Sequence, residues 1–200
     1  PGARMGPRAI REASHTLCDG THPLFGTTPL GRLGDAGDLA LPNTGIERMR
    51  KALMPLVEPL IRQHRMAWLG GDHSITLPLL RVYRRLLGRP LAVIHFDAHC
   101  DTWSDHFGEP SGHGTWVWEA FQEGLVEPSC FTQIGIRSPG EAAAVRYVAN
   151  EGGQIFTGRD LRGLESPAQL SPVLAAIRSR LAAAGHPPLY LSLDIDCLDP

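Results

Sequence analysis

The chain has 200 residues, of which 42% are hydrophobic and 20% charged, and this composition excludes a mainly disordered protein. Its 19 Lys and Arg residues against 21 Asp and Glu residues give a formal charge of -2, which argues against a nucleic-acid-binding or basic membrane-surface protein. No apolar run approaches the ~20 residues that a membrane span needs. The four cysteines show neither C-x-x-C spacing nor a disulfide framework, which favours a reducing cytoplasm.

Strand-like and helix-like stretches alternate along the chain. In chain order we predict a helix over 7–13, a short strand over 33–39, a helix over 44–65, a strand over 66–70, a helix over 74–87, a strand over 91–96, a helix over 116–123, a strand over 131–136, a helix over 140–150, a strand over 154–157, a helix over 166–184 and a strand over 189–193. Pro55 and Pro59 predict that the second helix kinks or splits. Apolar strands alternating with amphipathic helices are typical of a parallel α/β sheet covered on both faces.

In such folds ligands bind beyond the carboxyl ends of the strands. Three predicted strands are followed there by metal-capable side chains: Gly-Gly-Asp-His-Ser over 70–74, Asp-Ala-His-Cys-Asp over 97–101 and Asp-Ile-Asp-Cys-Leu-Asp-Pro over 194–200. Each cluster alone has an ordinary explanation, as a turn, a helix cap or a hydrogen-bonded structural histidine. Three such clusters at the ends of one sheet favour a functional site.

Side chains at i, i+2 and i+4 of an extended backbone point to one face. We therefore expect Asp97, His99 and Asp101 to converge, and the aspartates at both ends of the Asp-Ile-Asp triplet to do the same. Cys100 and Cys197 fall out of phase and should point away. The six candidate metal ligands are His73, Asp97, His99, Asp101, Asp194 and Asp196.

Converging carboxylates repel one another, and this repulsion raises their pKa values unless cations intervene. Two divalent cations would balance the four aspartates of the set. The set is too rich in oxygen for a structural zinc site. It suits Mn²⁺, with Ni²⁺ or Co²⁺ as alternatives. Because a pair of metals sharing carboxylates activates water near neutral pH, the pattern points to hydrolysis.

These motifs resemble the three metal-binding signatures of the ureohydrolases, the family of the arginases and agmatinases. The resemblance covers essentially all 200 residues, including an N-terminal segment over 1–11. It is closer to the agmatinases at Gly-Asp-Ala-Gly-Asp over 34–38, at His-Gly-Thr over 113–115 and at Gln-Ile-Gly-Ile-Arg over 133–137. The family resemblance implies a three-layer αβα fold with a mainly parallel central sheet and two Mn²⁺ ions.

By motif position, His73 would bind one metal and His99 the other. Asp97 and Asp194 would be shared, and Asp101 and Asp196 would complete the two sites. The resemblance also implies that Asp101 orients the activated water and that His113 shuttles a proton, which suits a side chain that titrates near neutral pH. On its own, His113 would be interpreted as a helix-capping loop histidine.

The resemblance implies a small cationic guanidino substrate. Agmatinases release urea and putrescine, a polyamine precursor, whereas arginases hold an amino-acid head group partly through an Asn and a Ser just before the His-Gly motif. The matching stretch over 107–113 has Ser111 but no Asn, which favours agmatine. Trp116 and Trp118 either line the site, which would favour guanidinobutyrate or another tail, or pack in their helix.

Three residues near the motifs receive other interpretations. His95 lies inside a predicted strand and is interpreted as a core residue. Asp72 and Asp199 adjoin the ligands, and we expect them to form the loops or to support the ligands from behind.

Alternative functions remain: a ureohydrolase acting on arginine, an acyl-lysine deacetylase of similar architecture with one zinc, and a non-catalytic subunit with the same fold. We expect residues 1–200 to form a single ureohydrolase domain, incomplete at the C-terminus and at the N-terminus. The family's guanidinium-binding Glu would then follow Pro200, so the 200 residues alone should be inactive. Family resemblance predicts a homo-oligomer, a trimer or a hexamer.

Overall fold

The structure, a computed structural model, describes residues 2–17, 20–105 and 107–198. The chain forms two compact units, Pro1–Asp72 and His73–Pro200. Among the described residues, no helix is both long enough and apolar enough to cross a membrane.

The first unit contains the 3-10 turn η1 (Ala3–Met5) and the helices α1 (Gly6–Ser14) and α2 (Ile46–Gln63). Helix α2 confirms the predicted helix, with Pro55 and Pro59 both inside it, so the helix does not split. Each proline removes only one backbone donor, and the neighbouring residues keep the helix continuous.

Two predicted strands of this unit are wrong: residues 33–39 and residues 66–70 form no strand. In the first of these segments, Asp35 accepts a hydrogen bond from the Gly37 backbone N–H at 2.9 Å, and it also binds Arg11 at 2.7 Å. Asp38 binds the same guanidinium. These side-chain bonds give the backbone an alternative to strand pairing. The second segment is apolar, but apolar character without a paired neighbour does not make a strand.

The second unit is built on a four-stranded sheet with the strand order β3-β2-β1-β4. The strands are β1 (Leu91–Phe96), β2 (Val126–Ile136), β3 (Gln154–Thr157) and β4 (Leu189–Leu193), and every pair is parallel. The register aligns the strand ends, because Phe96 is paired with Ile134 on one side and Leu193 on the other. The turns that follow β1 and β4 therefore leave the sheet at the same edge.

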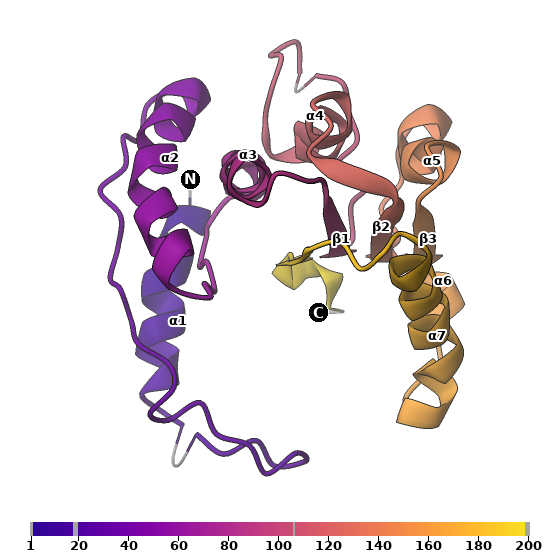
Figure 1. The fold of residues 1–200 in the computed structure, drawn as a ribbon, viewed down its shortest axis with the longest axis horizontal. Helices are drawn as coiled ribbons and strands as arrows, with labels where there is room; N and C mark the ends of the chain where they lie inside the picture. The colour runs from indigo at the N-terminus through magenta and orange to yellow at the C-terminus, as the bar shows by residue number, and fades with distance from the viewer. Residues whose placement is uncertain (1, 18–19, 106, 199–200) are drawn as a thin grey trace. The chain divides into compact units, whose positions relative to one another are not determined.

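One helix precedes β1, and the others connect the four strands, which confirms the predicted alternation from residue 74 onwards. The helices are α3 (Thr76–Leu87), α4 (Trp116–Gln122), α5 (Ala142–Asn150), α6 (Gly158–Leu161) and α7 (Pro167–Ala183). Figure 1 shows α4 and α5 on one side of the strands and α7 on the other, as in a three-layer αβα fold. The predicted fold class is thus confirmed.

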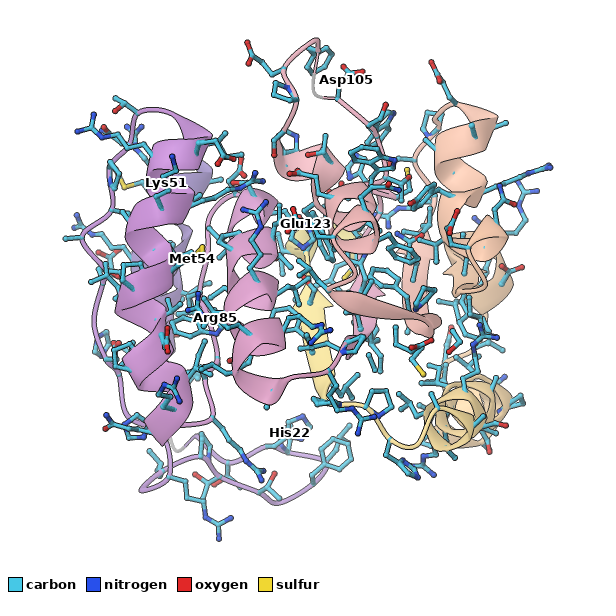
Figure 2. All side chains as sticks on the ribbon, turned by 45° about the horizontal axis from the view of Figure 1, so that its top comes forward. His22, Lys51, Met54, Arg85, Asp105 and Glu123 are labelled. Carbon is cyan, nitrogen blue, oxygen red and sulfur yellow. The ribbon has the colours of Figure 1, made fainter. Side chains whose placement is uncertain are left out.

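The core of this unit lies between the sheet and the helices α3, α4 and α5. Its fully buried members are Leu77, Leu80, Val93, Trp116, Val117, Ala120, Phe131 and Val148. At the rim of this layer, Arg81 of α3 donates to Glu123, the residue directly after α4, at 2.6 Å. Glu123 is labelled in Figure 2. The apolar layer and its ion pair hold α3 and α4 together, and both helices begin next to the edge where the strands end.

Candidate metal centre

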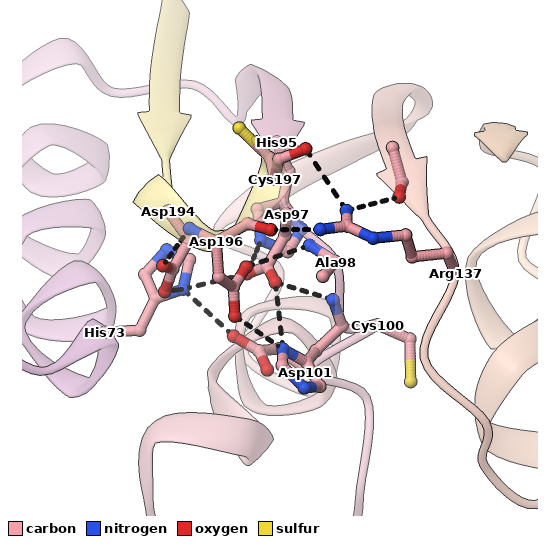
Figure 3. Close-up of polar contacts among 12 residues, drawn as sticks. His73, His95, Asp97, Ala98, Cys100, Asp101, Arg137, Asp194, Asp196 and Cys197 are labelled. Atoms are coloured by element: carbon pink, nitrogen blue, oxygen red, sulfur yellow. Dashed lines mark hydrogen bonds and ion pairs between the residues drawn. The ribbon is translucent and has the colours of Figure 1, made fainter. Parts of the chain in front are cut away.

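Three short turns of the second unit carry the candidate ligands (Figure 3). His73 opens the 3-10 turn η2 (His73–Ile75), immediately before α3. Asp97, His99 and Asp101 lie in the turn after β1. The remaining two aspartates cap and occupy η4 (Ile195–Cys197), the turn after β4. Because residues 66–70 form no strand, the expectation that His73 follows a strand end is wrong.

One group of side chains surrounds His73. Its Nδ1 atom lies 3.1 Å from Asp97 Oδ2, 3.1 Å from Asp101 Oδ2 and 3.4 Å from Asp194 Oδ2. The ring is largely buried, and the carboxylates come from both the β1 turn and the β4 turn. Three carboxylates, from two turns that are both distant from His73 in the sequence, therefore face one imidazole nitrogen.

A second group surrounds His99. Its Nδ1 atom lies 2.9 Å from Asp196 Oδ2 and 3.4 Å from Asp97 Oδ1. Asp97 thus directs one oxygen towards His73 and the other towards His99, and it belongs to both of the groups that could hold a metal ion. The structure brings all six predicted ligands into this double cluster.

The convergence does not arise from an extended backbone, as the spacing had suggested. Residues 98–99 form a bend, and Asp101 has a φ of 53°, in the left-handed region that Asp tolerates better than most residues. Asp101 consequently joins the His73 group, whereas His99 joins the other. Among the described residues, Cys100 and Cys197 belong to neither group, in agreement with the prediction.

The His73 ring offers a direct test of whether a cation fits. Its Nε2 atom lies 2.8 Å from Ser192 Oγ and makes a hydrogen bond with it. Its Nδ1 atom is buried and makes no hydrogen bond to any described residue, although three carboxylates face it. An imidazole nitrogen and several carboxylate oxygens directed at one point are the donor set of a transition-metal ion such as Mn²⁺. The residues present fit such an ion.

The charges in the cluster shift two pKa values in opposite directions. Burial of the His73 ring acts to lower its pKa, but the facing carboxylates of Asp101 and Asp97 raise it to about 10. Burial acts to raise the pKa of Asp97, and its contacts with His73 and His95 overcome this effect and lower it. The expected upward shift from repulsion is therefore wrong for Asp97, because two histidines contact it.

Asp196 shows the expected upward shift. Burial is the main cause of its raised pKa, and the negative charges of Asp97 and Asp194 add to it. The Ala98 backbone N–H donates to Asp196 Oδ1 at 3.1 Å, which opposes the shift.

His95 is fully buried, as the sequence predicted, but it also contacts a candidate ligand. Its Nε2 atom lies 2.8 Å from Asp97 Oδ2. Gln133 Nε2, a donor, lies 3.2 Å from His95 Nδ1 and also donates to the Cys100 carbonyl at 2.7 Å. Since His95 Nδ1 accepts this bond, Nε2 carries the proton that is donated to Asp97. The alternation of His95 with Asp97 along one face of the strand was the sequence signal for this contact.

Trp116 supports the interpretation of packing over that of a substrate-lining residue. Its side chain is fully buried, and its ring centroid lies 5.1 Å from that of His73 and 4.9 Å from that of His95. Its Nε1–H donates to Asp101 Oδ2 at 2.8 Å. The residue therefore belongs to the core and also orients a candidate ligand. Trp118 is half-buried on the same helix.

His113 lies at the start of the 3-10 turn η3 (His113–Thr115) and is exposed. Within this turn, Thr115 Oγ1 accepts a hydrogen bond from the Gly112 backbone N–H at 2.9 Å. The Trp103 backbone N–H donates to the Gly114 carbonyl at 3.1 Å, which ties η3 to the chain that follows Asp101. His113 therefore lies beside the segment that carries Asp101.

Asp72 is the last residue of the first unit. Asp199 lies outside the described residues.

A model of the Arginase family matches residues 1–200. An agmatinase of Chromobacterium violaceum is 36% identical over an alignment of 209 positions, which covers 100% of this chain and 58% of that protein. The chain therefore belongs to the arginase family. It spans about three fifths of the length of the curated relatives that it matches.

Two solved structures share this fold. Proclavaminate amidino hydrolase from Streptomyces clavuligerus is 31% identical, with a TM-score of 0.82 over 100% of this chain and 64% of that one. A hypothetical agmatinase from Burkholderia thailandensis is 33% identical, with a TM-score of 0.79 over 98% of this chain and 59% of that one.

The raised pKa of His73 predicts how the metal-free protein responds to pH. The stability that protonated His73 contributes should be fully present below its unfolded pKa near 6.5 and should be lost as the pH rises through about 10. Thermal melts of the metal-free protein should show a midpoint that falls across this window. The fall should be smaller in His73→Gln and unchanged in His64→Gln, a substitution of an exposed histidine. An equal fall in His73→Gln and the unmodified protein would contradict this assignment.

Proposed function

We propose that this chain is the metal-binding part of a binuclear hydrolase that cleaves the guanidino group of agmatine into urea and putrescine. The observation that carries the proposal is the double cluster, in which Asp97 directs its two carboxylate oxygens to two different histidines. A carboxylate shared in this way is the arrangement expected of a bridging ligand between two cations. The agmatinases among the relatives support the reaction class.

The six side chains divide between two cation sites. His73 and Asp101 would hold one ion, His99 and Asp196 the other, and Asp97 and Asp194 would be shared. The donor set favours Mn²⁺, with Ni²⁺ or Co²⁺ as alternatives. When bound, two such ions lower the pKa of water enough to supply a nucleophile at neutral pH. Around them, Trp116 and His95 orient Asp101 and Asp97 through the contacts described above.

Agmatine is preferred over arginine because of the segment before His113. Ser111, the residue that could bind an amino-acid head group, donates its hydroxyl to Glu119 Oε1 at 2.6 Å. The same carboxylate oxygen accepts from Thr115 Oγ1 at 2.6 Å. Because the Ser111 hydroxyl is already bonded to Glu119, these contacts support a substrate without an amino-acid head group. The name of the Streptomyces relative indicates an amidino hydrolase of another compound, so related guanidino substrates belong in the same test.

The proton that the leaving amine requires would come from His113. Its exposure and its place beside the Asp101 segment support this role, because a proton donor must reach both substrate and solvent. We further propose a cytoplasmic homo-oligomer, a trimer or a hexamer. The described free cysteines Cys100, Cys130 and Cys197 support a reducing compartment, and the family resemblance alone supports the assembly.

The function is tested by measuring urea released by the full-length protein. Agmatine, arginine, guanidinobutyrate and free guanidine are compared with Mn²⁺, Ni²⁺ and Co²⁺ as the loaded cation. We expect urea from agmatine in preference to the others and two metal ions per chain by elemental analysis. Urea from none of them would overturn the function. A single zinc per chain would support the deacetylase alternative instead.

Removal of the cations should destabilise the fold around the cluster. Cations that bind only the folded state stabilise it, by about 2.7 kcal/mol at a concentration 100 times Kd. Chelation should therefore lower the thermal midpoint of the full-length protein, and added Mn²⁺ should restore it. Asp97→Asn should abolish the Mn²⁺-dependent rise, whereas Glu165→Gln, at an exposed position, should keep it. A thermal midpoint that changes neither with chelator nor with added Mn²⁺ would count against a two-cation centre.

Substitutions should separate proton transfer from metal binding. His113→Ala should lower kcat by ~10²–10⁴-fold, the usual contribution of a positioned proton donor, while both metal ions stay bound. Asp97→Ala should lose metal and activity together. His64→Ala, at an exposed position, serves as the control and should change neither. Full turnover by His113→Ala at its pH optimum would show that the shuttle assignment is wrong.

A further inference from the structure

Arg137 is the last residue of the Gln-Ile-Gly-Ile-Arg segment over 133–137, and it is neither a candidate metal ligand nor a participant in the proposed reaction. It is the first residue after β2, which is the neighbour of β1 in the sheet. Its backbone N–H and that of Ser138 both donate to the Ala98 carbonyl, each at 2.9 Å. The backbone at Arg137 is therefore fixed to the turn that carries Asp97 and His99.

The side chain of Arg137 extends to the other ligand-bearing turn (Figure 3). Its Nη2 atom donates to the Asp196 carbonyl at 2.6 Å and to the Leu198 carbonyl at 3.1 Å. Its Nη1 atom donates to the Cys197 carbonyl at 3.1 Å. One guanidinium thus binds three consecutive backbone carbonyls, those of Asp196, Cys197 and Leu198.

Gly135, two residues earlier, lets β2 approach both turns. Its φ is 97°, and a Cβ added there would lie 3.2 Å from the Asp97 carbonyl oxygen and 3.8 Å from Cys197 Cβ. Only glycine adopts this backbone conformation without strain. The end of β2 therefore lies against both the Asp97 turn and the Asp196 turn. Arg137, two residues after Gly135, is consequently placed beside both turns.

Besides Arg137, the Asp196 turn is held from outside by two bonds: the Asp194 backbone N–H donates to the Phe96 carbonyl at 2.8 Å, and the Ala98 backbone N–H donates to Asp196 Oδ1 at 3.1 Å. Neither bond holds the backbone after Asp194, where the carbonyls bound by Arg137 lie. The backbone bonds within the turn are long, with 3.2 Å from the Cys197 N–H to the Asp194 carbonyl and 3.2 Å from the Leu198 N–H to the Ile195 carbonyl. The turn is a single 3-10 turn of three residues. A ligand carried on such a short turn keeps its position only if something outside the turn holds the backbone.

We propose that Arg137 is a positioning residue that locks the Asp196 turn onto the Asp97 turn and thereby sets the affinity of the cation held by Asp97, His99 and Asp196. The inference rests on the proposed two-cation centre. It distinguishes this cation from the one beside His73, whose ligands Asp97 and Asp101 lie on the β1 turn and whose imidazole ring is held by Ser192. The third carboxylate at His73, that of Asp194, comes from the start of the Asp196 turn, where the Asp194 backbone is fixed to the Phe96 carbonyl independently of Arg137. Loss of the guanidinium should weaken one cation site and spare the other.

The geometry also predicts which replacement fails. Arginine presents several N–H donors in a rigid planar fork, whereas lysine presents one compact charge. Arg137→Lys keeps the positive charge but cannot hold three carbonyls in the same way. It should therefore behave like Arg137→Met, if the hydrogen bonds matter. If only the charge mattered, then Arg137→Met would bind cations more tightly, because a like charge beside the site would be gone.

The test titrates metal-free full-length protein with Mn²⁺ and follows binding by calorimetry and by the electron paramagnetic resonance signal of paired ions. Arg180→Met is the matched control. Arg180 also donates to backbone carbonyls, those of Ser129 at 2.8 Å and Gly152, but it does so at the start of the strands instead of their ends. We expect two ions in the unmodified protein and in Arg180→Met. In Arg137→Met and Arg137→Lys, one ion should bind as before and the other ~10–100-fold more weakly, the usual cost of losing a partner behind a ligand.

Each outcome decides the question. Unchanged or tighter binding of both ions in Arg137→Met would overturn the inference, and equal weakening by Arg180→Met would show a general structural effect instead. If Arg137→Met does not fold, Arg137→Lys decides in the same way. In a His99→Gln background, Arg137→Met should cause no further loss, because the site it acts on is already gone. Failure of the unmodified protein to bind Mn²⁺ would instead overturn the two-cation centre itself.

Discussion

The buried carboxylate of Asp97 is the constraint on which the cluster depends. Its side chain is 1% exposed, and an isolated charge at such a depth would be strongly unfavourable. It is tolerated because His73 and His95 face one oxygen, while the His99 backbone N–H donates to the other at 2.6 Å. His73 and His99, around which the other carboxylates gather, both contact this one side chain.

The parallel register of the sheet makes this arrangement possible. His95 on β1 is paired with Gln133 on β2 and with Ser192 on β4. Gln133 sets the proton on His95, and Ser192 holds His73, so three neighbouring strands each orient one part of the cluster. The strands supply this support from behind, and the turns beyond them supply the ligands.

The sequence was sufficient to predict the turns after β1 and β4, because each Asp-rich motif follows an apolar strand of ordinary length. It was insufficient for 66–70, where an apolar segment forms no strand, and for 33–39, where Asp35 and Asp38 bind Arg11. The sequence was also insufficient to predict the contacts of Trp116 and Arg137. These contacts join residues that are 15 positions apart for Trp116 and about 60 positions apart for Arg137. Such pairs depend on how the strands are ordered and aligned in the sheet, and the local periodicity of a sequence does not reveal that order.

The bonds of Arg137 run to main-chain oxygens, and this has a consequence for how the segment tolerates change over evolution. The side chains at 197 and 198 take no part in these bonds, so the two positions can drift without releasing the guanidinium. Gly135 has no such latitude, because any side chain there meets the neighbouring turn. A residue far from the Asp-x-Asp motif in sequence is thus more tightly restricted than residues directly adjoining it.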